Sequence, residues 1–510
     1  MTKEQKLKFC GIMLLGIALR ALLITQIPAG LNQDEAYAGY EAFCMLFYGR
    51  DSHGYVNPSY LVTWGSGMSA LQSYMTIPFM ALLGPVPLAL RLPPLIMGCL
   101  MLAISLPLGR LLMPERPLLL SALLAVSPYY IMVSRWGLDA NLAPPLLFIG
   151  LFFLLRGAEN RRALIPAALI LGLSLYAYSL MWLVVPLSLV LWGIYVLWTK
   201  KLRFRELLLP GLLIFLMALP HILFMLINKG LIPEIRTDLF SIPRLVYMRS
   251  GELSIKNLLS AKHWKELLNI LFKQSDGYSY NTLPRFGLFY HISLPFIVAG
   301  WLRQGFCLAK SLRHREYSHE AVLSLAGFAA FFCCMLLRSV NISRSNYLHI
   351  YTLLSLALGT DALLSLLVRP KSTQRLLCAA YALCLIFFSA FYFGPYRQQS
   401  GDMFRAGLGE ALDFAQKQQA ELIYIDEEIY YPQLLFYTRT DPNEYAATVR
   451  YRNYPAPWLD VESFGIYRFG IDCVPQRDAV YVLYEKDRQP FLDAGCSITD
   501  FGRFSVAVWA

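Results

Sequence analysis

Long apolar stretches alternate with short charged segments along most of the chain. A helix needs about 20 apolar residues to cross a bilayer, and eleven stretches approach or exceed that length. They lie near residues 3–27, 91–113, 117–133, 140–156, 163–179, 181–199, 207–227, 286–303, 319–337, 346–368 and 375–393. The first begins like a signal peptide, but no small-residue cleavage site follows it, so we predict a retained helix. The pattern predicts an α-helical polytopic membrane protein with about 11 transmembrane helices.

A further apolar run at 68–84 decides the predicted topology. If this run does not cross the membrane, most Lys and Arg residues of the short loops fall on one side. They are Lys3, Lys6, Lys8, Arg110, Arg116, Arg156, Arg161, Arg162, Lys200, Lys201, Arg203, Arg205, Arg303, Lys310, Arg313, Arg315, Arg369, Lys371 and Arg375. The short loops on the other side then keep Arg135, Arg338 and Arg344. Because cytoplasmic loops are rich in Lys and Arg, we predict a cytoplasmic N-terminus and an interfacial helix at 68–84.

This topology sends three large segments to the extracytoplasmic side. Two are the outer loops 28–90 and 228–285, which belong to a membrane domain predicted at 1–396. The third is 397–510, where strand-like runs at 422–425, 479–484 and 504–509 alternate with helix-like runs at 403–418 and 432–437. Such alternation predicts a small extracytoplasmic α/β domain. Its Cys473 and Cys496 could pair in an oxidising compartment.

Composition excludes a soluble enzyme and a disordered chain. Of 510 residues, 56% are hydrophobic and 15% are charged, whereas soluble domains have about 25% charged residues. The 45 Lys and Arg residues exceed the 34 Asp and Glu residues, which gives a net charge of +11. In a membrane protein the positive-inside rule explains this excess, so we do not predict a nucleic-acid partner.

The first outer loop begins with an acidic pair, Asp34 and Glu35, a few residues after the first span. Large apolar side chains then recur at helical spacing, at Tyr37, Tyr40, Cys44 and Phe47. This pattern predicts an amphipathic helix on the membrane surface with the acids at its N-terminus. The alternative is that Asn32 or Asp34 only caps the helix, where acids are favoured in any case.

The segment QDEAYAGYEA at 33–42 resembles the acidic motif of membrane glycosyltransferases of the type-C fold that use polyprenyl-phosphate sugars. The likeness is to bacterial relatives of the dolichyl-phosphate-mannose protein mannosyltransferases and the aminoarabinose lipid A transferases, and it covers roughly 1–395 in layout. It implies a catalytic role beside the acceptor for Asp34, with Glu35 next to it. The chain lacks the His-Pro-Pro-like element and the inserted sugar-binding-type domain of the protein mannosyltransferases, so the acceptor stays open.

Three other polar segments are candidates for substrate contacts. Arg135, Asp139 and Asn141 lie in a predicted outward turn, where a guanidinium is suited to bind a phosphate. The alternative is an Arg–Asp pair that anchors the chain at lipid headgroups. Similar segments occur in bacterial members of the resembling family.

A late turn contains Arg338 and Arg344. In the resembling family, a basic residue near such a late span neutralises the donor phosphate, and Arg344 is favoured because it lies nearer the following span. Two solvated interface arginines are the alternative. The end of the 228–285 loop offers Tyr280, Asn281 and Arg285 for sugar binding, although an interfacial aromatic belt has the same composition.

Together these features predict a glycosyltransferase that moves a sugar from a polyprenyl-phosphate donor to an acceptor at the outer membrane face, with membrane lipids around it. The predicted acceptor is a cell-envelope polymer, a lipid or a protein. Asp34 is the predicted general base, Arg135 and Arg344 the phosphate ligands, and a single displacement would invert the anomeric centre. Adjacent acids also suit a divalent cation, but the sequence does not complete a ligand set. The rival predictions are a lipid flippase or transporter and a catalytically silent protein that binds lipid-linked glycans.

Overall fold

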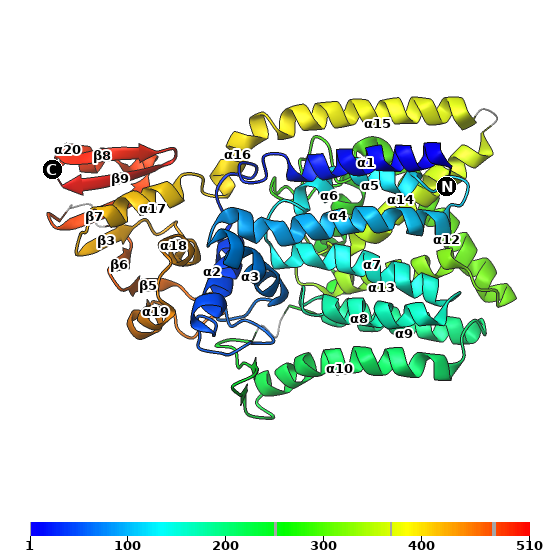
Figure 1. Ribbon diagram of the computed structural model, residues 1–510, viewed down its shortest axis with the longest axis horizontal. Coiled ribbons are helices and arrows are strands. Elements are labelled where there is room, and N and C mark those ends of the chain that lie inside the picture. Colours follow the sequence, from blue (N-terminus) through cyan, green and yellow to red (C-terminus); the bar gives the residue numbers. More distant parts are fainter. Residues whose placement is uncertain (1, 249–251, 368–369, 472–475, 510) are drawn as a thin grey trace.

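The computed structural model describes residues 2–248, 252–367, 370–471 and 476–509. Long helices run side by side and form a bundle, and a β-sheet region lies beyond one end of it (Figure 1). The N-terminus lies at the other end of the bundle (Figure 1). Cys473, predicted as a partner for Cys496, lies outside the described residues.

Eight of the helices in the described ranges are long and apolar enough to cross a membrane. They are α4 (Pro87–Leu112), Asp139–Gly157 with α7 (Ala143–Gly157), α9 (Met181–Trp198), α10 (Phe204–Asn228), His291–His314 with α12 (Leu294–His314), α13 (His319–Leu336), α14 (Leu348–Leu366) and α15 (Pro370–Tyr392). Each corresponds to one of the predicted spans. The chain is a multi-pass membrane protein.

The other three predicted spans differ from expectation. The run 117–133 forms two short helices, α5 (Leu119–Val126) and α6 (Pro128–Val133), because Pro128 lacks an N–H group and begins a new helix. The run 163–179 gives only the 11-residue α8 (Leu164–Ser174). The first helix, α1 (Lys3–Ala21), has 19 residues and includes charged residues that lower its hydropathy. The count of eleven thus falls to eight by length and composition.

Two helices of the first outer loop lie between the bundle and the sheet region (Figure 1). The first is α2 (Gln33–Tyr48) and the second is α3 (Leu71–Leu83). As predicted for 68–84, α3 is too short to cross, since 13 residues extend only about 20 Å at 1.5 Å each.

α2 begins at the predicted acids, but the exposed face expected of an amphipathic helix is not found, because protein covers it on both sides. Its residues from Glu35 to Met45 are all buried, and Gly39 explains how closely its neighbours approach. A Cβ atom at Gly39 would lie 2.6 Å from a methyl group of Leu90 in α4 and 2.8 Å from the ring of Phe436. Because Phe436 belongs to the C-terminal region, α2 is packed on one side by the bundle and on the other by that region.

The C-terminal region contains a seven-stranded sheet of order β4-β5-β6-β3-β7-β9-β8. Its strands are β3 (Leu422–Ile425), β4 (Arg450–Tyr451), β5 (Val461–Phe464), β6 (Tyr467–Phe469), β7 (Ala479–Tyr484), β8 (Cys496–Phe501) and β9 (Phe504–Trp509). The central β3 is parallel to β6 and β7, and the remaining neighbours are antiparallel. The predicted strands at 422–425, 479–484 and 504–509 are confirmed as β3, β7 and β9.

Short helices accompany this sheet and join it to the bundle. They are α16 (Pro395–Met403), α17 (Leu408–Lys417), α18 (Tyr431–Thr438), α19 (Pro442–Thr448) and α20 (Gln489–Asp493). Side chains of α2, α17, α18 and the sheet form one hydrophobic cluster. The second outer loop contains α11 (Ala261–Leu268) and the hairpin of β1 (Ile235–Arg236) and β2 (Ser241–Ile242).

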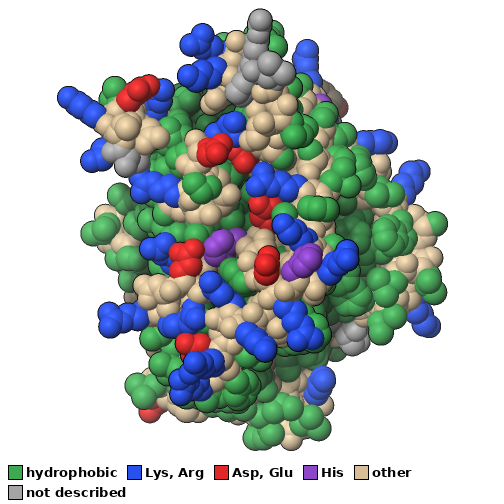
Figure 2. Space-filling model, turned by 90° about the vertical axis from the view of Figure 1, so that its right-hand side faces the viewer, with side chains coloured by type: hydrophobic (Ala, Val, Ile, Leu, Met, Phe, Trp, Pro, Cys, Tyr) green, Lys and Arg blue, Asp and Glu red, His purple; other side chains and the backbone are tan. Residues whose placement is uncertain are grey.

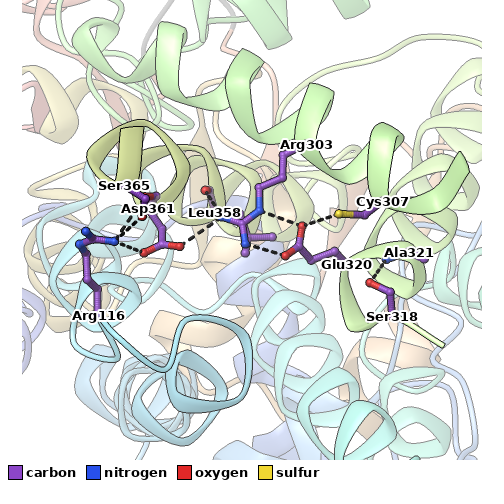
Figure 3. A network of polar contacts seen from close by, with 9 residues as sticks. All are labelled: Arg116, Arg303, Cys307, Ser318, Glu320, Ala321, Leu358, Asp361 and Ser365. Atoms are coloured by element: carbon purple, nitrogen blue, oxygen red, sulfur yellow. Dashed lines mark hydrogen bonds and ion pairs between the residues drawn. The ribbon is translucent and has the colours of Figure 1, made fainter. Parts of the chain in front are cut away.

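At the bundle end near the N-terminus, an ion-pair network joins four segments (Figure 3). Arg303 of α12 donates to Glu320 of α13 at 2.7 Å and to Asp361 of α14 at 3.1 Å, and Arg116 donates to Asp361 at 2.7 Å. Viewed from this end, the surface carries many Lys and Arg side chains and fewer Asp and Glu side chains (Figure 2).

Candidate functional site

A cavity of about 580 Å³ lies where the bundle meets the first outer loop and α16. Segments far apart in the sequence contribute its walls. They are Asn32, Gln33 and Asp34; Trp136, Leu138, Asp139 and Ala140; Tyr178; Gly277, Tyr278, Ser279 and Tyr280; Asn341, Ser343 and Arg344; and Met403. The predicted candidates Asp34, Asp139, Tyr280 and Arg344 are therefore brought together around one space.

Asp34 lies in the first turn of α2, with its side chain at the wall of the cavity. Asn32 is the residue that caps the helix, because its side chain accepts the Asp34 backbone N–H at 2.9 Å. The Asp34 carboxylate is thus not needed as a cap. Its Oδ1 accepts the indole N–H of Trp64 at 3.0 Å, and this bond orients the carboxylate at the cavity.

Glu35 has a different environment from its neighbour. Its side chain is fully buried and pairs with the equally buried Arg91, with Nε 3.0 Å from Oε1. The same carboxylate accepts the backbone N–H of Gly137 at 2.8 Å, and Arg91 also donates to the carbonyls of Ile24, Pro28 and Gly30. Glu35 does not line the cavity. It connects α2 to α4 and to the turn that carries Asp139.

The structure does not support Arg135 as a phosphate ligand. Its side chain is fully buried and donates to the carbonyls of Ile27, Leu19, Arg20 and Leu22 at 2.6 to 3.1 Å. The guanidinium also lies over the rings of Tyr392 and Phe393. Its donors satisfy the carbonyl groups at the end of α1, which would otherwise be unpaired in an apolar environment.

Of the two arginines in the late turn, one lines the cavity and the other does not. Arg344 lines the cavity, and its guanidinium donates to Glu252 and to Ser339, both at 3.0 Å. Arg338 is exposed, is not among the lining residues, and donates its backbone N–H to the carbonyl of Glu252 at 2.8 Å. Of the two, Arg344 is the one at the cavity.

Asp139 and Asn141 differ in whether they line the cavity. Asp139 lines the cavity beside Asp34, and its Oδ2 accepts the Ser69 backbone N–H at 3.4 Å. The two carboxylates are close enough to repel each other electrostatically. Asn141 is buried behind the wall and donates to the Trp136 carbonyl at 3.2 Å, so its side chain supports the turn instead of facing the cavity.

The second outer loop contributes Tyr280 to the cavity, next to Tyr278. Burial raises the pKa of the Tyr280 hydroxyl to about 12, so it stays a hydrogen-bond donor at neutral pH. Asn281 is buried and donates to Asp276 at 2.7 Å while it accepts from Ser343, which ties this loop to the Arg344 turn. Arg285 is exposed and does not line the cavity.

Sequence reasoning missed several wall residues. Tyr178 was included in a predicted span, but it lies in the turn after α8 and faces the cavity. Gln33 was not singled out, and Trp136 lay unremarked within the Arg135 turn. Trp64, whose indole N–H donates to Asp34 from behind the wall, was also missed. For Tyr178 and Trp136 the sequence offers one signal, an aromatic residue close to a predicted span end.

The carboxylates at this cavity do not form a larger metal-binding group. Within the described ranges, no cluster of three or more His, Cys, Asp or Glu side chains is placed to hold a metal ion. Asp34 and Asp139 supply two carboxylates at the wall, a number that can hold Mg²⁺ when waters and a substrate phosphate complete its coordination.

No protein-family model and no curated protein matches this sequence. Solved structures do match. ArnT from Cupriavidus metallidurans in the apo state has a TM-score of 0.56 at 13% identity, covering 99% of this chain and 97% of that one. The same protein bound to undecaprenyl phosphate gives 0.55 at 13% identity, with 99% and 98% covered. The chain shares the fold of ArnT.

A second match is more partial. The archaeal oligosaccharyltransferase AglB from Archaeoglobus fulgidus, in complex with an inhibitory peptide and a dolichol-phosphate, has a TM-score of 0.51 at 14% identity. The match covers 82% of this chain and 58% of AglB. ArnT and AglB both have the type-C glycosyltransferase fold, so the fold implied by the motif at 33–42 is confirmed.

A second acidic pair lies near the other end of α2. Glu41 is fully buried and accepts the Ser52 backbone N–H at 2.9 Å and its hydroxyl at 2.5 Å. Asp51 is also buried and accepts the backbone N–H groups of His53 and Tyr55. Burial raises the pKa of both carboxyls, and repulsion from Asp51 raises the pKa of Glu41 further.

These raised pKa values predict that the protein loses stability as the pH rises. Above the ordinary values of 4.5 and 3.8 the unfolded chain releases protons that the folded protein retains, so unfolding becomes easier until the folded groups also ionise. We expect the thermal unfolding midpoint to fall between about pH 5 and about pH 8, and to fall less in Glu41→Gln. The exposed Glu410→Gln is the control and should keep the parent's slope. Equal slopes in all three proteins would contradict the prediction.

Proposed function

We propose that the chain is an integral-membrane glycosyltransferase that transfers a sugar from a polyprenyl-phosphate donor to a hydroxyl acceptor at the outer membrane face. One observation carries the proposal: the Asp34 carboxylate and the Arg344 guanidinium line the same cavity, at the bundle end next to the C-terminal region. A base and a phosphate-binding cation on one space are the two groups that this reaction needs. The fold shared with ArnT, which was solved with undecaprenyl phosphate, supports a lipid phosphate as the leaving group.

In this mechanism Asp34 takes the proton of the acceptor hydroxyl. The freed oxygen forms a bond to the anomeric carbon while the bond from that carbon to the phosphate oxygen breaks. The electron pair leaves with the phosphate, whose charge Arg344 stabilises. Attack from the side opposite the phosphate inverts the anomeric centre. Glu35 and Arg91 act only as positioning residues, because they hold the first turn of α2.

Charge supports the proposed orientation. The end of the bundle that carries the N-terminus is rich in Lys and Arg (Figure 2), as cytoplasmic faces are. The C-terminal region and α2 lie toward the other end (Figure 1), and the first turn of α2 lines the cavity. A donor that reaches the cavity would then be one displayed in the outer leaflet.

The direct test is sugar release in a defined membrane. The full chain would be reconstituted in lipid nanodiscs with radiolabelled undecaprenyl-phosphate and dolichyl-phosphate hexoses and pentoses, and free or transferred sugar would be measured. Donor-dependent release supports the proposal. Binding of the donors without any release, in the presence of an envelope lipid and polysaccharide extract, would contradict it and would favour a flippase or a glycan-binding protein.

The two arginines of the late turn give a matched pair of variants. We expect Arg344→Met to lower kcat for sugar release by about a hundredfold, which is the usual cost of removing one group that stabilises developing charge. Arg338→Met removes the same charge from the same turn but away from the cavity, so it should stay within about twofold of the parent, the scale of a surface substitution. The measurement is the initial release rate at saturating donor. Equal losses of kcat in both variants would mean that the rate depends on the total positive charge of the turn. That result would contradict a specific role for Arg344.

A further inference from the structure

A second cavity, of about 490 Å³, lies between the first outer loop and the C-terminal sheet. We call it the Trp458 cavity. It is lined by Gln33, Trp64, Tyr430, Arg452, Trp458 and Asp460, among others. None of the roles argued above uses this space.

Aromatic side chains form much of its wall. The ring centroids of Trp64 and Trp458 are 5.4 Å apart with the planes at 62°, and those of Trp64 and Tyr430 are 6.2 Å apart at 85°. Because the rings meet edge to face, their flat surfaces point in different directions. Trp458 and Tyr430 keep 49% and 43% of their surface exposed, so a ligand can reach both side chains, and Arg405 lies over the Tyr430 ring at 5.5 Å.

Polar groups stand beside these rings. Arg452 and Asp460 form an ion pair at 3.3 Å. The Asn453 side chain donates to the Trp458 carbonyl and accepts the Asp460 backbone N–H, both at 2.8 Å. Glu427 adds a further carboxylate to the wall. One guanidinium and two carboxylates leave a net negative charge, which disfavours a phosphorylated or polyanionic ligand.

Backbone contacts between the first outer loop and the C-terminal region hold the wall of the Trp458 cavity in place. The backbone N–H of Leu459 donates to the Trp64 carbonyl at 3.0 Å, and Gly65 pairs with Trp458 in an antiparallel bridge. Gly65 has a φ of +87°, and a Cβ atom there would lie 2.7 Å from the Ala456 carbonyl oxygen. The position therefore needs glycine, and the loop of residues 452–460 is fastened directly over the first outer loop.

The Trp458 cavity adjoins the candidate active site. Gln33 lines both cavities. Trp64 lines the Trp458 cavity with its ring while its indole N–H donates to Asp34. The largely buried Trp64 side chain, 5% exposed, thus lies between the Trp458 cavity and the proposed base.

We infer that the Trp458 cavity binds a neutral or cationic sugar ring of a glycan acceptor and presents a hydroxyl of the neighbouring ring to Asp34. This inference rests on the proposed function and adds the acceptor class to it. The apolar C–H face of a pyranose fits an open aromatic ring, and its hydroxyls fit carboxylate, amide and guanidinium groups that fix orientation. Residues of both the first outer loop and the C-terminal region would contact the sugar, which gives the C-terminal region a role in acceptor recognition.

Binding can be tested without turnover. The full chain in nanodiscs would be titrated with cellotriose, chitotriose and the cationic glucosamine trimer by saturation-transfer NMR. We expect at least one probe to bind, with a Kd raised about tenfold or more in Trp458→Ala, as for loss of a central aromatic contact. Trp264→Ala removes a similarly exposed tryptophan of α11. Trp264 is not among the residues that line the Trp458 cavity, so this variant should leave the Kd unchanged.

The outcomes separate this inference from the proposed function. Asp34→Asn changes only the group that faces the presented hydroxyl, so it should still bind the probe even if it releases no sugar. If the parent binds the probe but shows no donor turnover, the Trp458 cavity stands as a glycan site and the glycosyltransferase proposal fails. Absence of binding by all three probes, or equal affinity in the parent and Trp458→Ala, would overturn the inference.

Discussion

Replacing Asp34 with Asn should lower donor-dependent sugar transfer by a hundredfold or more. The amide keeps the size of the side chain and can still accept the Trp64 indole N–H that bonds Oδ1 at 3.0 Å. It cannot accept the acceptor proton, and general-base catalysis commonly contributes 10²–10⁴-fold. The measurement is the transfer rate in nanodiscs at saturating donor and acceptor, with donor binding measured in parallel.

Asp139→Asn is the matched comparison for this prediction. Asp139 lines the same cavity, and burial together with the nearby Asp34 charge raises the pKa of its carboxyl to about 7. Because Asp34→Asn removes the proposed base and Asp139→Asn leaves it in place, we expect Asp139→Asn to reduce the rate by less than Asp34→Asn. If Asp139→Asn abolishes transfer and Asp34→Asn does not, the base is Asp139 and our assignment fails.

Breaking the ion pair of Glu35 and Arg91 should give the largest loss of stability. Both side chains are fully buried, and removing one partner of such a pair leaves an unpaired charge in an apolar environment, at a cost of about 3–5 kcal/mol. We expect Glu35→Gln and Arg91→Met each to lower the free energy of unfolding by about that amount. Denaturant unfolding of the detergent-solubilised chain, followed by tryptophan fluorescence, would measure it.

An exposed pair provides the control. Arg156 and Glu159 are 3.2 Å apart and about half exposed, and such surface pairs contribute at most about 1 kcal/mol. Glu159→Gln should therefore unfold close to the parent. If Glu35→Gln is as stable as Glu159→Gln, the Glu35–Arg91 pair does not fasten the first turn of α2, and its positioning role has to be abandoned.

The membrane layout follows closely from local sequence. Eight of the predicted spans are found as long apolar helices, because hydropathy over about 20 residues directly reports the cost of placing a segment in lipid. Where the prediction differed, local chemistry explains part of the difference. Pro128 divides the 117–133 run into α5 and α6, and a window average does not register a single residue without an N–H group.

The site residues were predicted less completely than the membrane spans, and Arg135 and Arg344 show why. Arg135 and Arg344 look alike in the sequence, since each is an arginine in a polar turn at the end of a span. Arg135 is fully buried and satisfies the carbonyls at the end of α1, whereas Arg344 lines the cavity. Which donors are already used by backbone carbonyls depends on where α1 ends in space, and no local pattern records that.

The acidic pair divides in the same way. The sequence alone determined that Asp34 and Glu35 begin a helix after the first span, because the Asn32 cap and the following run are local signals. Successive helix residues point about 100° apart, so one acid of the pair had to face away from the other. Only the tertiary structure decided which one, because Arg91 and Gly137 bind Glu35 in the core and leave Asp34 at the cavity wall. The contacts that bury and pair Glu35 join segments that are about 50 and 100 residues apart in the sequence. The free energy of those contacts decides which carboxylate is buried and which lies at the cavity.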